Sequence, residues 1–211
     1  MPNTQPIDQI LNMASLLELR NIHKRYDSGT VALTDMSLVV GEHEFVSLLG
    51  PSGCGKSTAL KMIAGLSSIT SGSIAWSSGG TDHAHDMSFV FQEPTLMPWS
   101  TVFDNVWLPL RLAGKSREQA REPVESALQT VGLAQFARAY PRELSGGMMM
   151  RVSIARAMVT QPRLLLMDEP TAALPGARDL DRQCAVGSDN PADTSLPIER
   201  GLVARPGERI G

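Results

Sequence analysis

The sequence lacks the features that identify several large classes of protein. No run of apolar residues approaches the roughly 18 that a membrane-spanning helix needs, so any membrane role must come through a partner. The first 14 residues contain no charged segment followed by an apolar one, and no secretion signal is therefore expected. The net charge is -3 and no long basic run occurs, which argues against nucleic acid as the main partner.

Cysteine is scarce in this chain, which has only Cys54 and Cys184. Cys54 lies in a glycine-rich loop and Cys184 in a polar tail, so a structural disulfide is not expected and a reducing cytoplasm fits better. Hydrophobic residues make up 42% of the 211 residues, which is enough for the core of one domain, with or without an appendage.

The clearest positive feature is a glycine-rich loop. Residues 50–58 fit the pattern G-x-x-x-x-G-K-[ST], between an expected buried strand at 44–49 and an expected helix at 56–64. The glycines let successive backbone N–H groups point at one anion. Lys56 supplies a charge for β- and γ-phosphates, and the Ser57 hydroxyl is suited to Mg²⁺. The residues expected to bind phosphate are Gly50, Pro51, Ser52, Gly53, Cys54, Gly55, Lys56, Ser57 and Thr58.

Polar side chains follow two further expected strands. Gln92 comes after the strand at 87–91, and two carboxylates come after the four-residue apolar run at 164–167, which predicts a strand buried on both faces. Two acids at the end of a buried strand are costly unless they serve a cation or a proton; a solvated loop start is the alternative. We expect Asp168 to hold Mg²⁺ and Glu169 to accept a proton from, or orient, the attacking water. The expected catalytic residues are Glu169, Gln92 and Lys56, and the expected metal ligands are Ser57, Gln92 and Asp168.

A second anion-binding feature is predicted at Ser145-Gly146-Gly147. This run stands at the start of a strong helix former that extends from 148 to 160. A serine cap followed by two glycines leaves helix N–H groups open toward an anion. Taken alone the run is also consistent with a plain N-cap, but its place between the phosphate loop and Asp168 favours the anion site.

Three other features each keep two interpretations. Tyr26 either stacks on a purine or packs at the end of a hairpin. Cys54 is either a small residue that fits the loop, which is favoured, or a redox-sensitive thiol. His83 and His85 either bind a metal or belong to a solvated loop, which is favoured because no third ligand is near in the sequence.

The remaining segments predict more strands and a group of helices. Strands are expected at 15–20, 36–40 and 72–76. From 101 to 139 the apolar residues recur at helical spacing, and Pro109 is expected to kink or end the first of these helices. Before these helices, an exposed Trp99 beside a nucleotide site would suit a partner surface.

The ordered set of motifs resembles the ATP-binding subunit of ABC transporters. The phosphate loop, Gln92 after a strand, the Leu-Ser-Gly-Gly run at 144–147 and Asp168-Glu169-Pro170 after an apolar run carry this resemblance over roughly residues 16–174. More narrowly, the segments Val90 to Trp99 and Tyr140 to Met148 are similar to the importers for nitrate, sulfonates and taurine.

The resemblance implies a fold and a domain plan. The fold would be an α/β P-loop NTPase of the ABC ATPase type, with a mainly parallel core sheet, an antiparallel β subdomain, an inserted helical subdomain and an incomplete C-terminal part. The expected domains are a flexible arm at 1–14, the ATP-binding domain at 15–174 with its helical insertion at about 101–160, and an atypical, disordered tail at 175–211.

The resemblance also implies a function with ATP and Mg²⁺ as cofactors. Two copies of the chain would close head to tail around two ATP molecules, with Ser145-Gly146-Gly147 of one copy touching the γ-phosphate held by Lys56 of the other. Two transmembrane permease subunits would dock near residues 92–99 and the inserted helices, and a periplasmic or extracellular solute-binding protein would act indirectly. The chain would be peripheral, on the cytoplasmic face of the cell membrane. In such proteins an aromatic at the place of Tyr26 stacks on adenine.

The chain departs from the family pattern after Pro170. The family continues Ala-Leu-Asp, whereas Ala173-Leu174 is followed here by Pro175-Gly176, so the aspartate that couples the two sites is missing. The family also has a later strand that ends in a switch histidine, and no histidine follows His85. Nine of the 37 residues from 175 to 211 are proline or glycine, close to the range typical of disorder. A truncation or frameshift near codon 175 would explain the change.

These departures leave three hypotheses about function. The chain is an importer ATPase, a truncated ATP-binding module with little or no hydrolysis, or a nonfunctional remnant that does not hold a fold. A strand missing beside residues 163–167 would leave an unpaired sheet edge, so marginal stability and a tendency to aggregate are predicted.

Overall fold

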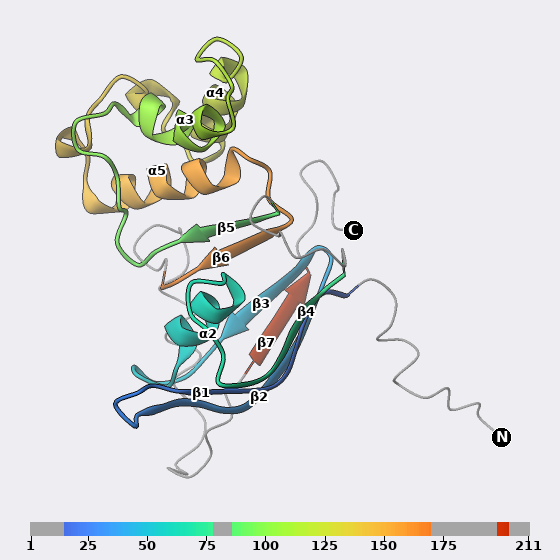
Figure 1. Cartoon of the computed structure of the whole chain (residues 1–211). Helices are drawn as coiled ribbons and strands as arrows, with labels where there is room; N and C mark the ends of the chain where they lie inside the picture. Colours follow the sequence, from blue (N-terminus) through green and yellow to red (C-terminus); the bar gives the residue numbers. More distant parts are fainter. Residues whose placement is uncertain (1–14, 78–85, 170–197, 203–211) are drawn as a thin grey trace. The chain divides into compact units, whose positions relative to one another are not determined.

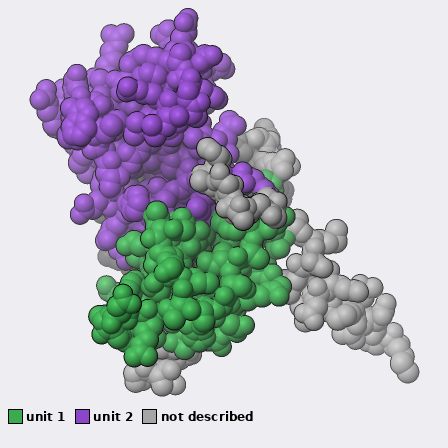
Figure 2. Space-filling model, in the orientation of Figure 1, with its two compact units in different colours: residues 1–82, 188–211 green, residues 83–187 purple. Residues whose placement is uncertain are grey.

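A computed structural model describes residues 15–77, 86–169 and 198–202. The chain divides into two compact units, residues 1–82 with 188–211 and residues 83–187 (Figure 2). Among the described residues, no helix is long and apolar enough to cross a membrane. The paired histidines, Cys184, the departure after Pro170 and most of the tail fall outside these residues.

The first unit contains a three-stranded antiparallel sheet in the order β2-β1-β4. Its strands are β1 (Ser15–Arg25), β2 (Val31–Gly41) and β4 (Ser71–Trp76). β1 is the central strand, because Leu19 is paired with Leu38 on one side and with Ile74 on the other. Leu17, Leu19 and Ile22 of this strand are almost completely buried. The expected strands at 15–20, 36–40 and 72–76 are all present, although β1 and β2 are longer than expected.

The strand that leads into the phosphate loop is β3 (Glu44–Leu48), and α2 (Lys56–Ile63) follows the loop. β3 pairs antiparallel with β7 (Ile198–Leu202), as Figure 1 shows. The expectation of a disordered tail is therefore wrong for these five residues of β7. β3 is also less buried than expected: Phe45 is 51% exposed, because β3 has only one partner strand among the described residues.

The second unit combines two parallel strands with helices. β5 (Met87–Val90) and β6 (Leu164–Met167) pair in parallel, with Phe89 opposite Leu166. α5 lies between this pair and the two helices α3 and α4 (Figure 1). An apolar core formed by Val106, Leu128 and Val152, among others, holds the helices together. The helical elements are α3 (Val102–Leu112), α4 (Arg121–Thr130), the 3-10 turns η1 (Ala134–Phe136) and η2 (Pro141–Glu143), and α5 (Gly146–Met158).

One local expectation for this unit is narrowed and another is corrected. Pro109 does not end α3, which continues to Leu112, and the Pro109 carbonyl accepts a hydrogen bond from the Ala113 N–H at 3.0 Å, so a kink at Pro109 stays the remaining prediction. β6 is not buried on both faces: Leu166 is buried but its other three residues are half-buried. In the part of the chain that the structure describes, β6 has β5 as its only strand neighbour, which leaves its other edge without a strand.

Candidate nucleotide-binding and catalytic residues

The backbone of the phosphate loop requires glycine at position 55. Gly55 has φ +102°, a conformation that side chains disfavour, and it forms the N-cap of α2. A Cβ added there would lie 2.5 Å from the Ala32 carbonyl oxygen and 2.8 Å from Leu33 Cδ2. Gly50 and Gly53 also have positive φ, at 140° and 85°. The loop therefore favours glycine at all three positions and has no room for a side chain at Gly55.

Lys56 is the first residue of α2 and folds back over the loop. Its Nζ donates to the carbonyl oxygens of Gly50 at 2.6 Å and Pro51 at 3.1 Å, and lies 3.6 Å from Cys54 Sγ. No side chain caps the start of α2, so its first N–H groups are available to an anion. An ammonium group beside an uncapped helix N-terminus is the arrangement that a polyphosphate needs.

Tyr26 lies beside the helix that follows the phosphate loop. Its Oη is 3.4 Å from Thr58 Oγ1, its ring centroid is 5.0 Å from Lys24 Nζ, and the side chain is 43% exposed. The structure thus places Tyr26 and the phosphate loop in the same unit. Whether the ring stacks on adenine stays a prediction.

A second group of expected site residues lies in the second unit, at the carboxyl ends of β5 and β6. The Asp168 N–H donates to the Val90 carbonyl at 2.9 Å, which continues the strand pairing by one step. Asp168 is buried, with 6% exposure, whereas Glu169 is exposed and has φ +47°. The Gln92 side-chain Nε2 donates to Glu169 Oε2 at 2.9 Å. Two of the expected catalytic side chains therefore meet in the structure.

The predicted anion site at residues 145–147 is the N-terminus of α5. Ser145 is the N-cap, and its Oγ accepts a hydrogen bond from the Met148 N–H at 3.3 Å. Gly146 and Gly147 form the first turn, so the helix begins two residues earlier than expected. A Cβ added at Gly146 would meet nothing within 4 Å. Local packing does not require glycine there, which leaves close approach by another molecule as a reason for it.

The oxygen donors of the expected magnesium site suit that ion. Mg²⁺ prefers hydroxyl, amide and carboxylate oxygens, which are the groups of Ser57, Gln92 and Asp168. Ser57 belongs to the first unit and the other two residues to the second. No group of three or more His, Cys, Asp or Glu side chains suited to a metal occurs in residues 15–77 and 86–169. This finding is compatible with the expected set, in which Asp168 is the only residue of those types.

Sequence reasoning missed two polar residues that hold the segment after Gln92. Asn105 on α3 is completely buried and forms four hydrogen bonds with the backbone of Met97, Ser100 and Thr101. Arg156 on α5 donates to the backbone of Pro94 and Thr95. A polar residue inside an apolar helical stretch was the available signal in both cases.

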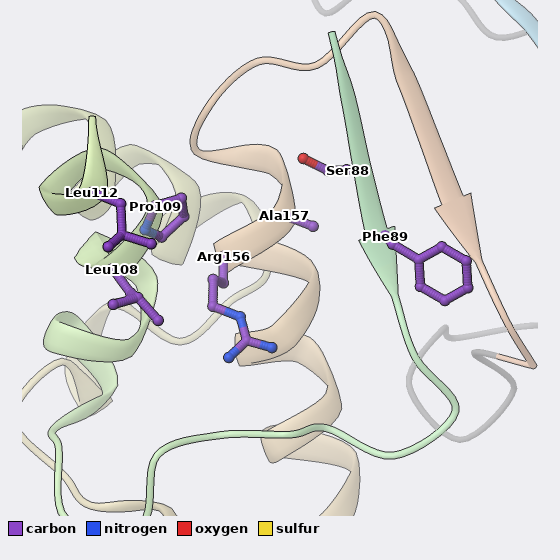
Figure 3. A pocket seen from close by; sticks show the side chains of 7 residues that line it. All are labelled: Ser88, Phe89, Leu108, Pro109, Leu112, Arg156 and Ala157. Atoms are coloured by element: carbon purple, nitrogen blue, oxygen red, sulfur yellow. The ribbon is translucent and has the colours of Figure 1, made fainter. Parts of the chain in front are cut away.

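A cavity of about 230 Å³ in the second unit lies near these contacts (Figure 3). α3 lines it with Leu108, Pro109 and Leu112, and the other lining residues are Ser88, Phe89, Arg156 and Ala157. Leu112 is 80% exposed, and Trp99, in the loop before α3, is 76% exposed. Single exposed apolar side chains are common on protein surfaces, so the partner surface near Trp99 stays a prediction.

Comparison with known proteins shows similarity to ATP-binding proteins of ABC transporters. The family described as ABC transporter matches residues 33–172. A spermidine/putrescine import ATP-binding protein, PotA of Marinobacter nauticus, is 43% identical over 164 residues, which cover 76% of this chain and 44% of that protein. The Fe(3+) ions import ATP-binding protein FbpC of Rhizobium etli is 44% identical over 161 residues, covering 74% and 45%. The chain thus spans about half the length of the curated relatives it matches.

Two solved structures share this fold. A dimeric structure of a post-hydrolysis state of the ATP-binding cassette MJ0796, bound to ADP and Pi, is 35% identical, with a TM-score of 0.69 and coverage of 80% of each chain. The structure of cbiO1 from Clostridium perfringens, part of the ABC transporter complex cbiONQ, is 26% identical, with a TM-score of 0.70 and coverage of 80% of this chain and 72% of that one.

Proposed function

The chain belongs to the ABC transporter family, and from this premise we propose that it is the ATP-binding subunit that couples ATP hydrolysis to import of a solute. The expected P-loop fold of the ABC ATPase type is confirmed by the two solved structures. The observation that carries the proposal for this chain is the 2.9 Å hydrogen bond between Gln92 and Glu169 at the ends of two parallel strands. It brings together the two side chains that hydrolysis would use.

The first unit, which contains the phosphate loop and Tyr26, would bind the nucleotide. The loop around Gly55 presents backbone N–H groups, Lys56 contributes the positive charge for the β- and γ-phosphates, and Tyr26 stacks on adenine. Ser57, Gln92 and Asp168 would hold Mg²⁺, which supplies charge neutralisation at the phosphate oxygens.

Hydrolysis would depend on Glu169 and Gln92. The Glu169 carboxylate is exposed, so it can accept a proton from a water molecule that attacks the γ-phosphate. The Gln92 amide donates to this carboxylate and thereby orients it, while the amide oxygen of Gln92 can face a cation. The pair thus offers a base and a group that positions it.

The proposed partners follow from the helix N-terminus and from the exposed apolar residues. Ser145, Gly146 and Gly147 would touch the γ-phosphate bound by a second copy of the chain, so that the anion is held only when both copies are present. Two permease subunits would dock near residues 92–99 and the inserted helices, where Trp99 and Leu112 are exposed. The chain would then be a peripheral protein of the cytoplasmic face of the cell membrane, served indirectly by a solute-binding protein.

The solute we propose is small and charged or strongly polar. Residues 90–99 and 140–148 favour nitrate, a sulfonate or taurine, whereas the relatives compared above carry names that refer to spermidine, putrescine and Fe(3+). The solute is selected by the binding protein and the permease in either case. Transport assays with the cognate permease, in which each of these solutes competes, would distinguish the classes.

A second candidate function rests on the residues after Pro170. Pro175-Gly176, where the family pattern has the coupling aspartate, favours a module that binds ATP but hydrolyses it poorly. Loss of one preorganised stabilising group commonly reduces a rate by about 10²–10³.

Steady-state turnover of Mg²⁺-ATP by the purified chain, with Glu169→Gln as control, tests these functions. Turnover that disappears in the control supports the importer ATPase. ATP binding without turnover supports the binding module, and a Lys56→Ala variant should abolish that binding. If the chain neither binds nor hydrolyses ATP, both proposals are refuted.

A further inference from the structure

The loop that carries Gln92 is held at both of its ends. This Gln92 loop comprises residues 91–101, between β5 and α3. At its start, the Val90 carbonyl is bound by the Asp168 N–H at 2.9 Å. At its end, Asn105 Oδ1 accepts from the Met97 N–H at 2.7 Å, and Asn105 Nδ2 lies 3.0–3.2 Å from the carbonyl oxygens of Met97, Ser100 and Thr101.

The middle of the Gln92 loop is held by α5. Arg156 Nη1 donates to the Thr95 carbonyl at 3.0 Å, and Arg156 Nη2 lies 2.9 Å from Thr95 Oγ1 and 3.3 Å from the Pro94 carbonyl. Ser153, one turn earlier on the same helix, is buried and also donates to the Pro94 carbonyl. Two side chains of α5 therefore bind two consecutive residues of the loop.

Arg156 is a half-buried charge whose acceptors are neutral, and it contacts a strained part of the loop backbone. The acceptors found for its guanidinium among the described residues are neutral carbonyl and hydroxyl oxygens. The group is half-buried, and this burial lowers the pKa of Arg156. Thr95 has φ +47°, which is uncommon for a β-branched residue and needs support from its surroundings. The half-buried charge of Arg156 therefore contacts the loop at Thr95, the residue whose backbone is strained.

We propose that Arg156 is a positioning residue for Gln92. Only Phe91, Gln92 and Glu93 separate Val90, which strand pairing fixes, from Pro94, which Arg156 and Ser153 fix. The same helix begins with Gly146, next to its cap Ser145. A shift of α5 is therefore transmitted through Arg156 to the Gln92 loop. Arg156 acts through this backbone, and its effect on turnover rests on the proposed function.

Arg151 provides a matched control on the same helix. It is also half-buried, and its Nη1 donates to the Val131 carbonyl at 3.1 Å. None of its contacts found in the structure involves residues 91–101. Replacing either arginine by methionine removes one half-buried guanidinium from α5. Only Arg156→Met removes the contacts with the Gln92 loop.

Amide hydrogen exchange of the full chain, without nucleotide, tests the positioning role directly. We expect Arg156→Met to accelerate exchange of the Met97 amide, whose N–H is bound by Asn105 Oδ1 at 2.7 Å, by at least about tenfold, because the Gln92 loop loses the contacts with α5 that hold it in place. Arg151→Met should leave the exchange of this amide unchanged. Unchanged exchange of the Met97 amide in Arg156→Met, or an equal increase in both variants, would overturn the inference.

A second variant decides the question if Arg156→Met does not fold. Thr95→Val keeps the shape of a β-branched side chain and removes only the hydroxyl that Arg156 binds. A faster exchange of the Met97 amide in this variant supports the proposal, and unchanged exchange contradicts it.

Kinetics separate a positioning role from general loss of structure. If the wild-type chain hydrolyses ATP, Arg156→Met should reduce kcat at least about tenfold and leave the Kd for ATP within about twofold. Arg156→Lys should restore part of kcat, since an ammonium can bind one of the two carbonyls at a time. A change in Kd with kcat preserved would refute the role in turnover. If the wild-type chain shows no turnover, the importer ATPase fails, but the exchange experiment still decides the positioning role.

Discussion

Gln92 Nε2 lies 2.9 Å from Glu169 Oε2, although the two residues follow different strands. The parallel pairing of β5 and β6 explains this proximity, because it aligns the carboxyl ends of the two strands at one edge. The hydrogen bond fixes the direction of a carboxylate that is otherwise exposed. The two side chains therefore form one functional pair, whose members should not act independently.

The first prediction concerns this pair. We expect Gln92→Ala to reduce kcat by about 10²–10³ and Glu169→Gln by about 10²–10⁴. The double variant should be no slower than Glu169→Gln alone, because residues that act as a unit have non-additive effects. Turnover measurements on all four proteins would check this. Additive losses would show that the two side chains work separately.

The second prediction concerns the phosphate loop. Gly53→Ala should cost about 1–2 kcal/mol of unfolding free energy, since Gly53 has positive φ but open space around it. Gly55→Ala should cost about 1–3 kcal/mol more, because its Cβ would collide with the Ala32 carbonyl. Urea unfolding of both variants measures the difference, and equal losses would contradict the crowding around Gly55.

The third prediction separates the cap role of Ser145 from a role in nucleotide contact. Ser145→Ala and Thr101→Ala both remove a side chain that caps a helix, and each should cost about 1 kcal/mol of unfolding free energy. Only Ser145→Ala should also weaken ATP-dependent association of two copies, measured by sedimentation in Mg²⁺-ATP with the Glu169→Gln background. If Thr101→Ala weakens association equally, the effect is one of stability.

The fourth prediction concerns Tyr26. Tyr26→Ala should raise the Kd for ATP about 10- to 100-fold if the ring stacks on adenine, because stacking on an aromatic ring is worth about 1–3 kcal/mol. Tyr26→Phe keeps the ring and loses only the 3.4 Å contact with Thr58, so it should bind ATP almost as well as the wild type. Titration with a fluorescent ATP analogue would distinguish them. Similar weakening by both substitutions would assign the role to the hydroxyl.

The fifth prediction concerns β7. A chain that ends at Pro197 lacks β7, whereas a chain that ends at Leu202 retains it and serves as the control. Loss of the antiparallel ladder with β3 should lower the unfolding free energy by on the order of 2–5 kcal/mol, and ATP binding should weaken because β3 leads into the phosphate loop. Unfolding curves and ATP titrations of the two proteins would check this. Equal stability would mean that the pairing contributes little.

The local parts of the candidate site could be predicted from sequence, for physical reasons. Gly55 and Ser145 mark a positive φ and a helix cap, which depend on the residue and its immediate neighbours. Gln92 and Glu169 could be placed because each follows a strand-forming run directly. These signals are short in range, and the backbone geometry that they imply is present in the structure.

The burial of strands could not be predicted in the same way. Phe45 and the apolar run of β6 were expected to be buried, but burial depends on neighbours that are distant in the sequence. β7 gave no signal, because Ile198–Leu202 lacks an alternating apolar pattern. Arg156 was missed since its partners, Pro94 and Thr95, belong to a loop whose path only the fold determines.

The pairing of β3 with β7 has a consequence for how this chain can vary between relatives. An antiparallel ladder is formed by main-chain N–H and C=O groups, which every residue other than proline supplies in full. A segment of quite different composition could therefore occupy the edge of β3, provided that proline is absent from its bonded positions. Substitutions, and even replacement of the whole segment, would be tolerated at this edge far better than at Gly55, where a single methyl group does not fit.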